Sequence, residues 1–159
     1  MGYGGRKGGL NPPQNDSRRP MAEITLQTKQ MCGHLLTQVA QENVQATGDL
    51  SLLSAEHNPE VKEAMRLLRE AEQGFHSLCG DRSLQRINVT ISIADSLLTL
   101  QRHEEARLKY ESVLPVAQDV FGDSHSHVNH IKANLASARG LQGSSRSEQD
   151  ETIRLKLGC

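Results

Sequence analysis

The apolar residues of this chain recur at intervals of three and four residues in four separate segments. That spacing places them on one face of an α-helix, so each segment predicts an amphipathic helix. The first segment spans residues 21–47, and the others lie at about 59–79, 103–121 and 128–138. Their apolar stripes are Ile24, Thr28, Met31, Leu35 and Val39; Val61, Ala64, Leu68, Ala71, Phe75 and Leu78; Ala106, Tyr110, Val113, Ala117 and Val120; and Val128, Ile131, Leu135 and Ala138.

Residues with strong end preferences mark the limits of these helices. Asn58 is a good N-cap, and Pro59 and Glu60 after it suit the first helical turn. Gly80 and Gly122 follow the second and third stripes, where a helix commonly ends on glycine. Pro115 lies inside the third stripe and is expected to bend that helix or to force a local adjustment.

The segment around residues 87–98 fits two kinds of secondary structure. An alternation of apolar and polar residues favours a half-buried strand, and a second set of apolar residues favours a helix. The alternating set is Ile87, Val89, Ile91 and Ile93, and the helical set is Ile87, Ile91, Ala94 and Leu98. The local pattern does not choose between the two.

An internal repeat of 42 residues favours the helix. Displaced by 42 positions, the chain matches itself at both helix-ending glycines and at several stripe positions. The matched pairs include Gly80-Asp81 with Gly122-Asp123, Glu63-Ala64 with Glu105-Ala106, Leu68 with Tyr110, and Ile93 with Leu135. Periods of this length are typical of helix–turn–helix repeats, and a strand at 87–93 would interrupt the unit.

The repeat resembles the tetratricopeptide repeat (TPR) in its longer, kinesin-light-chain-like form. Residues 121–128 stand where that form has LGPDHPDV, and Gly122, His125 and Val128 match it directly. Residues 134–136 match its NLA, and residues 102–106 resemble its RYxEA. The resemblance is clearest over residues 59–143 and departs from the pattern at Gln101, which replaces the turn glycine.

The resemblance implies an all-α fold, an α-α superhelix of antiparallel helix pairs over residues 21–143. Such arrays leave a concave groove lined by the first helix of each pair, where a partner peptide or helix binds. The implied function is therefore a non-enzymatic protein-interaction scaffold without a cofactor, with possible self-association through uncapped repeat ends. The groove residues expected from the polar positions are Asn88, Ser92, Asp95, His130 and Asn134, of which Asn134 is carried by the family pattern.

A histidine-rich segment offers an alternative function. Asp123, His125, His127 and His130 are residue types that hold zinc, so a metal-binding or catalytic domain centred on residues 123–130 stays open. The resemblance instead makes His125 an inter-repeat loop residue without a metal role. No cysteine lies near and no HExxH motif is present, so we expect no metal.

Composition adds expectations about the two ends and the compartment. Residues 1–20 are rich in Gly and Pro and carry four basic residues against one acidic residue. We expect a disordered leader there, with nucleic-acid binding through it as a further alternative. Residues 144–159 are expected to form a flexible polar tail. Three cysteines without a CxxC pair, no secretory signal and no apolar run of membrane length predict a cytoplasmic protein.

Overall fold

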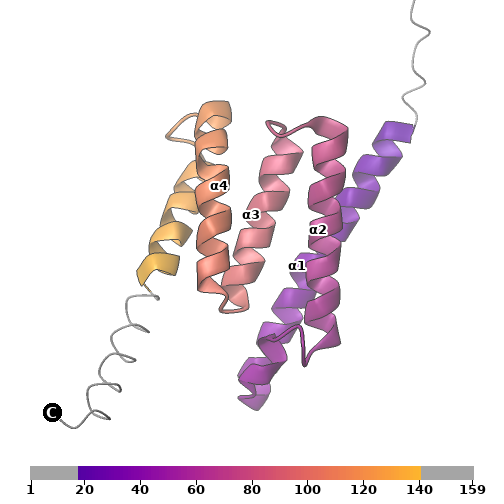
Figure 1. Ribbon diagram of the computed structural model, residues 1–159, viewed down its shortest axis with the longest axis vertical. Coiled ribbons are helices and arrows are strands. Elements are labelled where there is room, and N and C mark those ends of the chain that lie inside the picture. The colour runs from indigo at the N-terminus through magenta and orange to yellow at the C-terminus, as the bar shows by residue number, and fades with distance from the viewer. Residues whose placement is uncertain (1–17, 141–159) are drawn as a thin grey trace, which may run out of the picture.

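The computed structural model describes residues 18–140, and all the regular structure in that range is helical. The elements are α1 (Arg18–Thr47), the short 3₁₀ helix η1 (Leu50–Leu53), α2 (Pro59–Cys79), α3 (Leu84–Thr99), α4 (His103–Phe121) and a last helix over residues 126–140. Neighbouring helices pack antiparallel, and α1 crosses behind α2 at one side of the molecule (Figure 1). The predicted all-α class is confirmed.

α1 begins earlier than the sequence analysis expected. Arg18, Arg19 and Pro20 were assigned to the leader, yet they form the first turn of α1. Proline is tolerated there because the first N–H groups of a helix have no intrahelical partner. The rest of the predicted leader and the whole predicted tail, residues 144–159, lie outside the described residues.

The predicted caps of α2 are confirmed. The side-chain oxygen of Asn58 accepts a hydrogen bond from the backbone N–H of Glu60 at 2.9 Å. The amide nitrogen of Asn58 also donates to the carbonyl of Leu52 at 2.8 Å, which fixes the loop that enters the helix. At the far end Gly80 has a φ of 80°, and Gly122 ends α4 with a φ of 86°. These left-handed values explain why glycine recurs at the end of both repeat units.

The turn between α3 and α4 contains a residue in an unfavourable backbone conformation. Gln101 has a φ of 59°, and it is the one residue other than glycine with a positive φ in the part of the chain that the structure describes. This is the position where the resembling family has a glycine. α4 then runs without interruption through Pro115, from His103 to Phe121.

α1 packs against α2 through small residues, and its predicted apolar stripe faces outward. The residues of α1 that are buried are Gly33, Thr37, Ala40 and Val44. A Cβ atom on Gly33 would lie 2.7 Å from Cγ of Leu68 and 3.0 Å from the carbonyl oxygen of Ala64. The two backbones therefore approach too closely for a larger residue, and this contact selects the buried face of α1. All five residues of the predicted stripe are exposed, so the face that periodicity predicted to be buried is wrong.

α3 is a helix, so the strand interpretation of residues 87–93 is wrong. Eight of its residues are buried, on several sides of the helix: Ile87, Val89, Thr90, Ile91, Ile93, Ala94, Ser96 and Leu97. α3 packs against α1, α2 and α4, as Figure 1 lets the reader follow for α2 and α4. A helix covered on several sides has no continuous polar face, which is why its sequence also alternates like a strand.

A half-buried carboxylate joins α2 to the next two helices. Glu72 on α2 accepts hydrogen bonds from Nζ of Lys109 at 2.9 Å and from Nη1 of Arg86 at 2.9 Å. Burial alone raises the pKa of Glu72, but the bonds and charges of Lys109, Arg86 and Thr90 outweigh it, so the net pKa lies below its ordinary value. The charged form of Glu72 therefore stabilises the packing of α2 on α3 and α4.

No helix in residues 18–140 is both long enough and apolar enough to cross a membrane.

Candidate partner-binding groove

Side-chain hydrogen bonds connect α3 both to α1 and to the last helix. Nε2 of Gln30 on α1 donates to Oγ of Ser92 on α3 at 2.7 Å. Seven residues further along α1, Oγ1 of Thr37 donates to Oγ of Ser96 at 3.3 Å. Asp95, three residues after Ser92 on α3, bonds to residues of the last helix. These bonds bring polar side chains of α1, α3 and the last helix next to one another.

A hollow of about 490 Å³ opens between these three helices. Its lining residues are Gln30, Asn88, Ile91, Ser92, Ser126, His127 and His130. The volume falls in the range of ligand-binding clefts. Apart from Ile91, the lining side chains are amides, hydroxyls and imidazoles, which can donate and accept hydrogen bonds. None of the lining residues carries a fixed charge, so the hollow suits a neutral polar ligand such as a peptide backbone better than a strongly charged group.

The five predicted groove residues divide between this hollow and a neighbouring network. Asn88, Ser92 and His130 line the hollow. Asp95 and Asn134 lie further along the same helices and bond to each other, with Nδ2 of Asn134 donating to Oδ1 of Asp95 at 3.0 Å. The structure thus brings three of the five together at one open surface and uses the other two in helix packing.

Asp95 is the centre of that network. The hydroxyl of Tyr110 on α4 donates to Oδ1 of Asp95. Nε2 of His130 lies 3.0 Å from the same oxygen and therefore acts as its donor. Nδ2 of Asn134 also lies 3.0 Å from Oη of Tyr110. Because His130 belongs to both the network and the hollow, the network orients one wall of the hollow.

The environment of Tyr110 keeps its hydroxyl protonated. Tyr110 is completely buried, and burial is the larger cause that raises its pKa far above the ordinary value. The hydrogen bond and the negative charge of Asp95 raise it further, against a smaller opposite effect of Asn134. A phenol that stays neutral can donate to Asp95 at any ordinary pH, so this bond is structural.

The histidines of residues 125–130 point to different partners. Nδ1 of His125 accepts a hydrogen bond from the backbone N–H of His127 at 3.2 Å, as a loop residue would. The ring of His125 stacks on Phe121 at 4.5 Å between centroids, and His127 meets Phe121 edge-on at 5.4 Å. His130 turns instead toward Asp95. The three rings thus belong to an aromatic cluster and a carboxylate network.

Asp123, the remaining residue of the metal-site alternative, bonds elsewhere. Its Oδ1 accepts from Nε2 of Gln118 at 2.6 Å and lies 3.6 Å from Nζ of Lys132. Within residues 18–140 there is no group of three or more His, Cys, Asp or Glu side chains that could hold a metal ion. The arrangement of residues 123–130 therefore gives the metal or catalytic hypothesis no geometric support.

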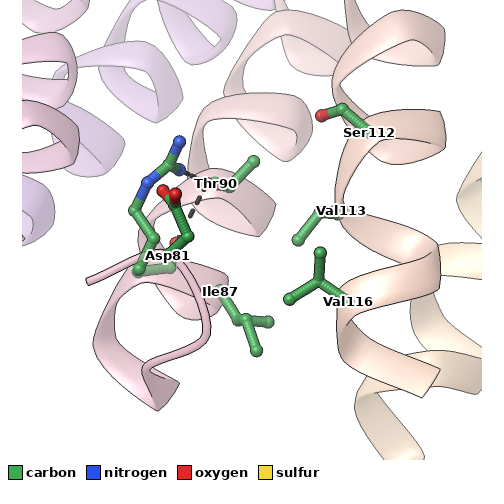
Figure 2. Close-up of a pocket in the computed structure, with 7 residues that line it drawn as sticks. Asp81, Ile87, Thr90, Ser112, Val113 and Val116 are labelled. Atoms are coloured by element: carbon green, nitrogen blue, oxygen red, sulfur yellow. Dashed lines mark hydrogen bonds between the residues drawn. The ribbon is translucent and has the colours of Figure 1, made fainter. Parts of the chain in front are cut away.

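A second hollow, of about 300 Å³, lies between the start of α3 and the middle of α4. Figure 2 shows Ile87 and Thr90 facing Val113 and Val116 across it, with Asp81 at one rim. Arg86, also in its lining, is already bonded to Glu72 at 2.9 Å and to Thr90. With its cation occupied and an apolar far wall, this hollow offers fewer free polar groups than the first.

Sequence reasoning missed the contributions of α1 and of the first turn of the last helix. Gln30, Ser126 and His127 line the first hollow but were not among the expected groove residues. Gln30 and Ser92 are 62 positions apart, and no local pattern joins them. His127 could have been found, because the repeat puts it at the start of a first helix.

Comparison of this chain with protein-family models, with curated proteins and with solved structures found no significant match. The likeness to tetratricopeptide repeats therefore rests on the residues quoted above and on the 42-residue repeat in the sequence.

Proposed function

We propose that this protein is a non-enzymatic interaction module, built as a short TPR-like α-α superhelix, that binds a segment of a partner protein. The observation that carries the proposal is the hollow lined by Gln30, Asn88, Ser92 and His130 on α1, α3 and the last helix. In the proposed superhelix these helices take the place of the first helices of successive pairs, the elements that line the concave groove in repeat arrays.

The chemistry of the hollow supports an extended peptide as ligand. Hydroxyl, amide and imidazole groups can pair with the N–H and C=O groups of a peptide backbone. Asn88 is half-buried, and no hydrogen bond ties its side chain to the rest of the described chain, so its amide is available. Ile91, the apolar residue of the lining, gives a contact for one side chain of the peptide.

Selection of a displayed peptide library against the purified protein tests the proposal. Peptides selected by the wild-type chain are measured against Asn88→Arg, which fills the hollow, and against Ser112→Arg, an exposed position on α4 that lines the second hollow instead. We expect Asn88→Arg to weaken binding at least tenfold and Ser112→Arg to change it less than twofold. Selected peptides that bind both variants equally well would refute a groove at this place.

A further inference from the structure

The outward side of α1 carries large apolar residues in contact with water. Met21, Ile24, Met31, Leu35 and Val39, which we call the outer face of α1, are between 42% and 66% exposed. Together with Thr28 they recur at steps of three and four over nearly the whole helix. Isolated exposed apolar residues are ordinary, but a continuous stripe of them marks an interaction site.

Packing within the described chain leaves this face uncovered. The buried residues of α1, on the side that faces α2 and α3, are Gly33, Thr37, Ala40 and Val44. At 100° per residue these lie on nearly the opposite side of the helix from Ile24, Met31 and Leu35. α1 therefore has one buried face of mostly small residues and an opposite, exposed face of large apolar residues.

The outer face also lacks the charges that normally solvate a helix. Between Lys29 and Glu42 α1 contains no Asp, Glu, Lys or Arg. A surface without charge meets no like-charge repulsion when it faces an identical copy of itself, as it does across a two-fold axis. The face is therefore compatible with self-association.

The charges near the ends of α1 favour one relative direction of two copies. Arg18 and Arg19 begin the helix and Glu42 lies near its end, and all three are exposed. Glu23 pairs with Arg19 at 3.6 Å, so one net positive charge remains at the start of the helix. An antiparallel pair places the basic end of one helix beside the acidic end of the other. A parallel pair places like charges together. A two-fold axis near residue 30 would bring Met21 of one copy opposite Val39 of the other.

The size of the outer face fits a stable dimer. From Met21 to Val39 the helix is about 27 Å long. The five exposed side chains offer roughly 500 Å² of apolar surface per copy, the size of a functional patch. With the flanking Thr28, Cys32 and Gln38, the pair approaches the roughly 800 Å² per partner of standard interfaces. We propose that a second copy of this chain docks antiparallel on the outer face of α1.

The proposal does not rest on the peptide groove, because Gln30 and the outer face lie on different sides of α1. Its test is sedimentation equilibrium of the full chain from 1 to 200 μM. We expect a monomer–dimer equilibrium for the wild type and at least a twentyfold weaker dimer for Met31→Glu/Leu35→Glu. Both substituted positions are exposed, so helicity by circular dichroism should stay unchanged. A wild type that is monomeric at 200 μM overturns the proposal, whether another segment or a different protein covers the face.

A matched control and a cross-linking experiment make the test specific. Leu84 and Leu108 are 51% and 53% exposed on α3 and α4, so Leu84→Glu/Leu108→Glu should dimerise like the wild type. Equal dissociation of this control would overturn the proposal. For cross-linking, all three native cysteines are first changed to Ser, and Met21→Cys or Val39→Cys is then introduced into separate chains. Each variant is oxidised by itself and in a mixture with the other. Disulfide dimers that form chiefly in the mixture support the antiparallel pair, and dimers in the separate samples refute it.

Discussion

The close approach of α1 and α2 at Gly33 predicts that Ala substitutions at two helical glycines, Gly33 and Gly74, affect stability differently. Both Gly33 and Gly74 lie inside helices, so replacing either by Ala gains about 1 kcal/mol of intrinsic helix propensity. They differ in what the added methyl group meets. At Gly33 it meets the buried Cγ of Leu68 at 2.7 Å and a backbone oxygen, that of Ala64, at 3.0 Å. At Gly74 it meets only the side-chain end of the half-buried Leu26.

These surroundings determine the expected magnitudes. Overpacking against groups that cannot move costs about 1–3 kcal/mol, which exceeds the propensity gain at Gly33. The end of Leu26 can change rotamer, so most of the gain at Gly74 should survive. We expect Gly33→Ala to lower the free energy of unfolding by about 1 kcal/mol, and Gly74→Ala to leave it unchanged or to raise it by up to about 1 kcal/mol.

The measurement is urea unfolding followed by circular dichroism at 222 nm. Because the propensity gain is common to both variants, their difference of about 1–2 kcal/mol isolates the steric effect at Gly33. With an m-value of about 1–3 kcal/mol per molar urea, the two midpoints should differ by about 1 M. Gly33→Ala equal to or more stable than Gly74→Ala would mean that α1 and α2 do not approach as described.

Three further substitutions test the turn at Gln101, the cap at Asn58 and the half-buried carboxylate of Glu72, all by urea unfolding. Gln101→Gly should raise stability by about 0.5–1 kcal/mol, because glycine adopts the φ of 59° without strain, and a loss would contradict that conformation. Asn58→Ala should cost about 1–2 kcal/mol, since it removes both the cap bond and the loop bond; the control is Asn43→Ala, inside α1. The lowered pKa of Glu72 stabilises the fold above its unfolded pKa of about 4.3, and that stability is lost as pH falls through the folded value. Glu72→Gln should therefore destabilise at pH 7 and much less at pH 3; a pH-independent difference would refute the linkage.

The helices and most of their ends follow from the sequence. The end signals Asn58, Gly80 and Gly122 act within a few residues, through caps and left-handed backbone that depend little on the rest of the fold. The 42-residue repeat also identified residues 87–98 as helical, which the local pattern could not do. Three of the five groove residues, Asn88, Ser92 and His130, were predicted from polar positions on the first helices and do line one hollow.

Tertiary packing decided which face of each helix is buried. In α1 the pattern selected the face of Met31 and Leu35, but the buried face contains Gly33 and Ala40. Periodicity measures only where apolar residues gather, whereas close helix packing requires small residues at the crossing point. No local pattern contains that requirement, because it depends on Leu68 and Ala64 of another helix.

The polar networks also depend on contacts between residues that are far apart in the sequence. Asp95 bonds to Tyr110, His130 and Asn134, which lie 15 to 39 positions away, and Gln30 reaches Ser92 across 62 positions. The sequence by itself determined the helices, because capping and periodicity are short-range. The tertiary structure alone decided the buried face of α1 and the partners of Asp95, because both are set by distances between residues far apart in the chain.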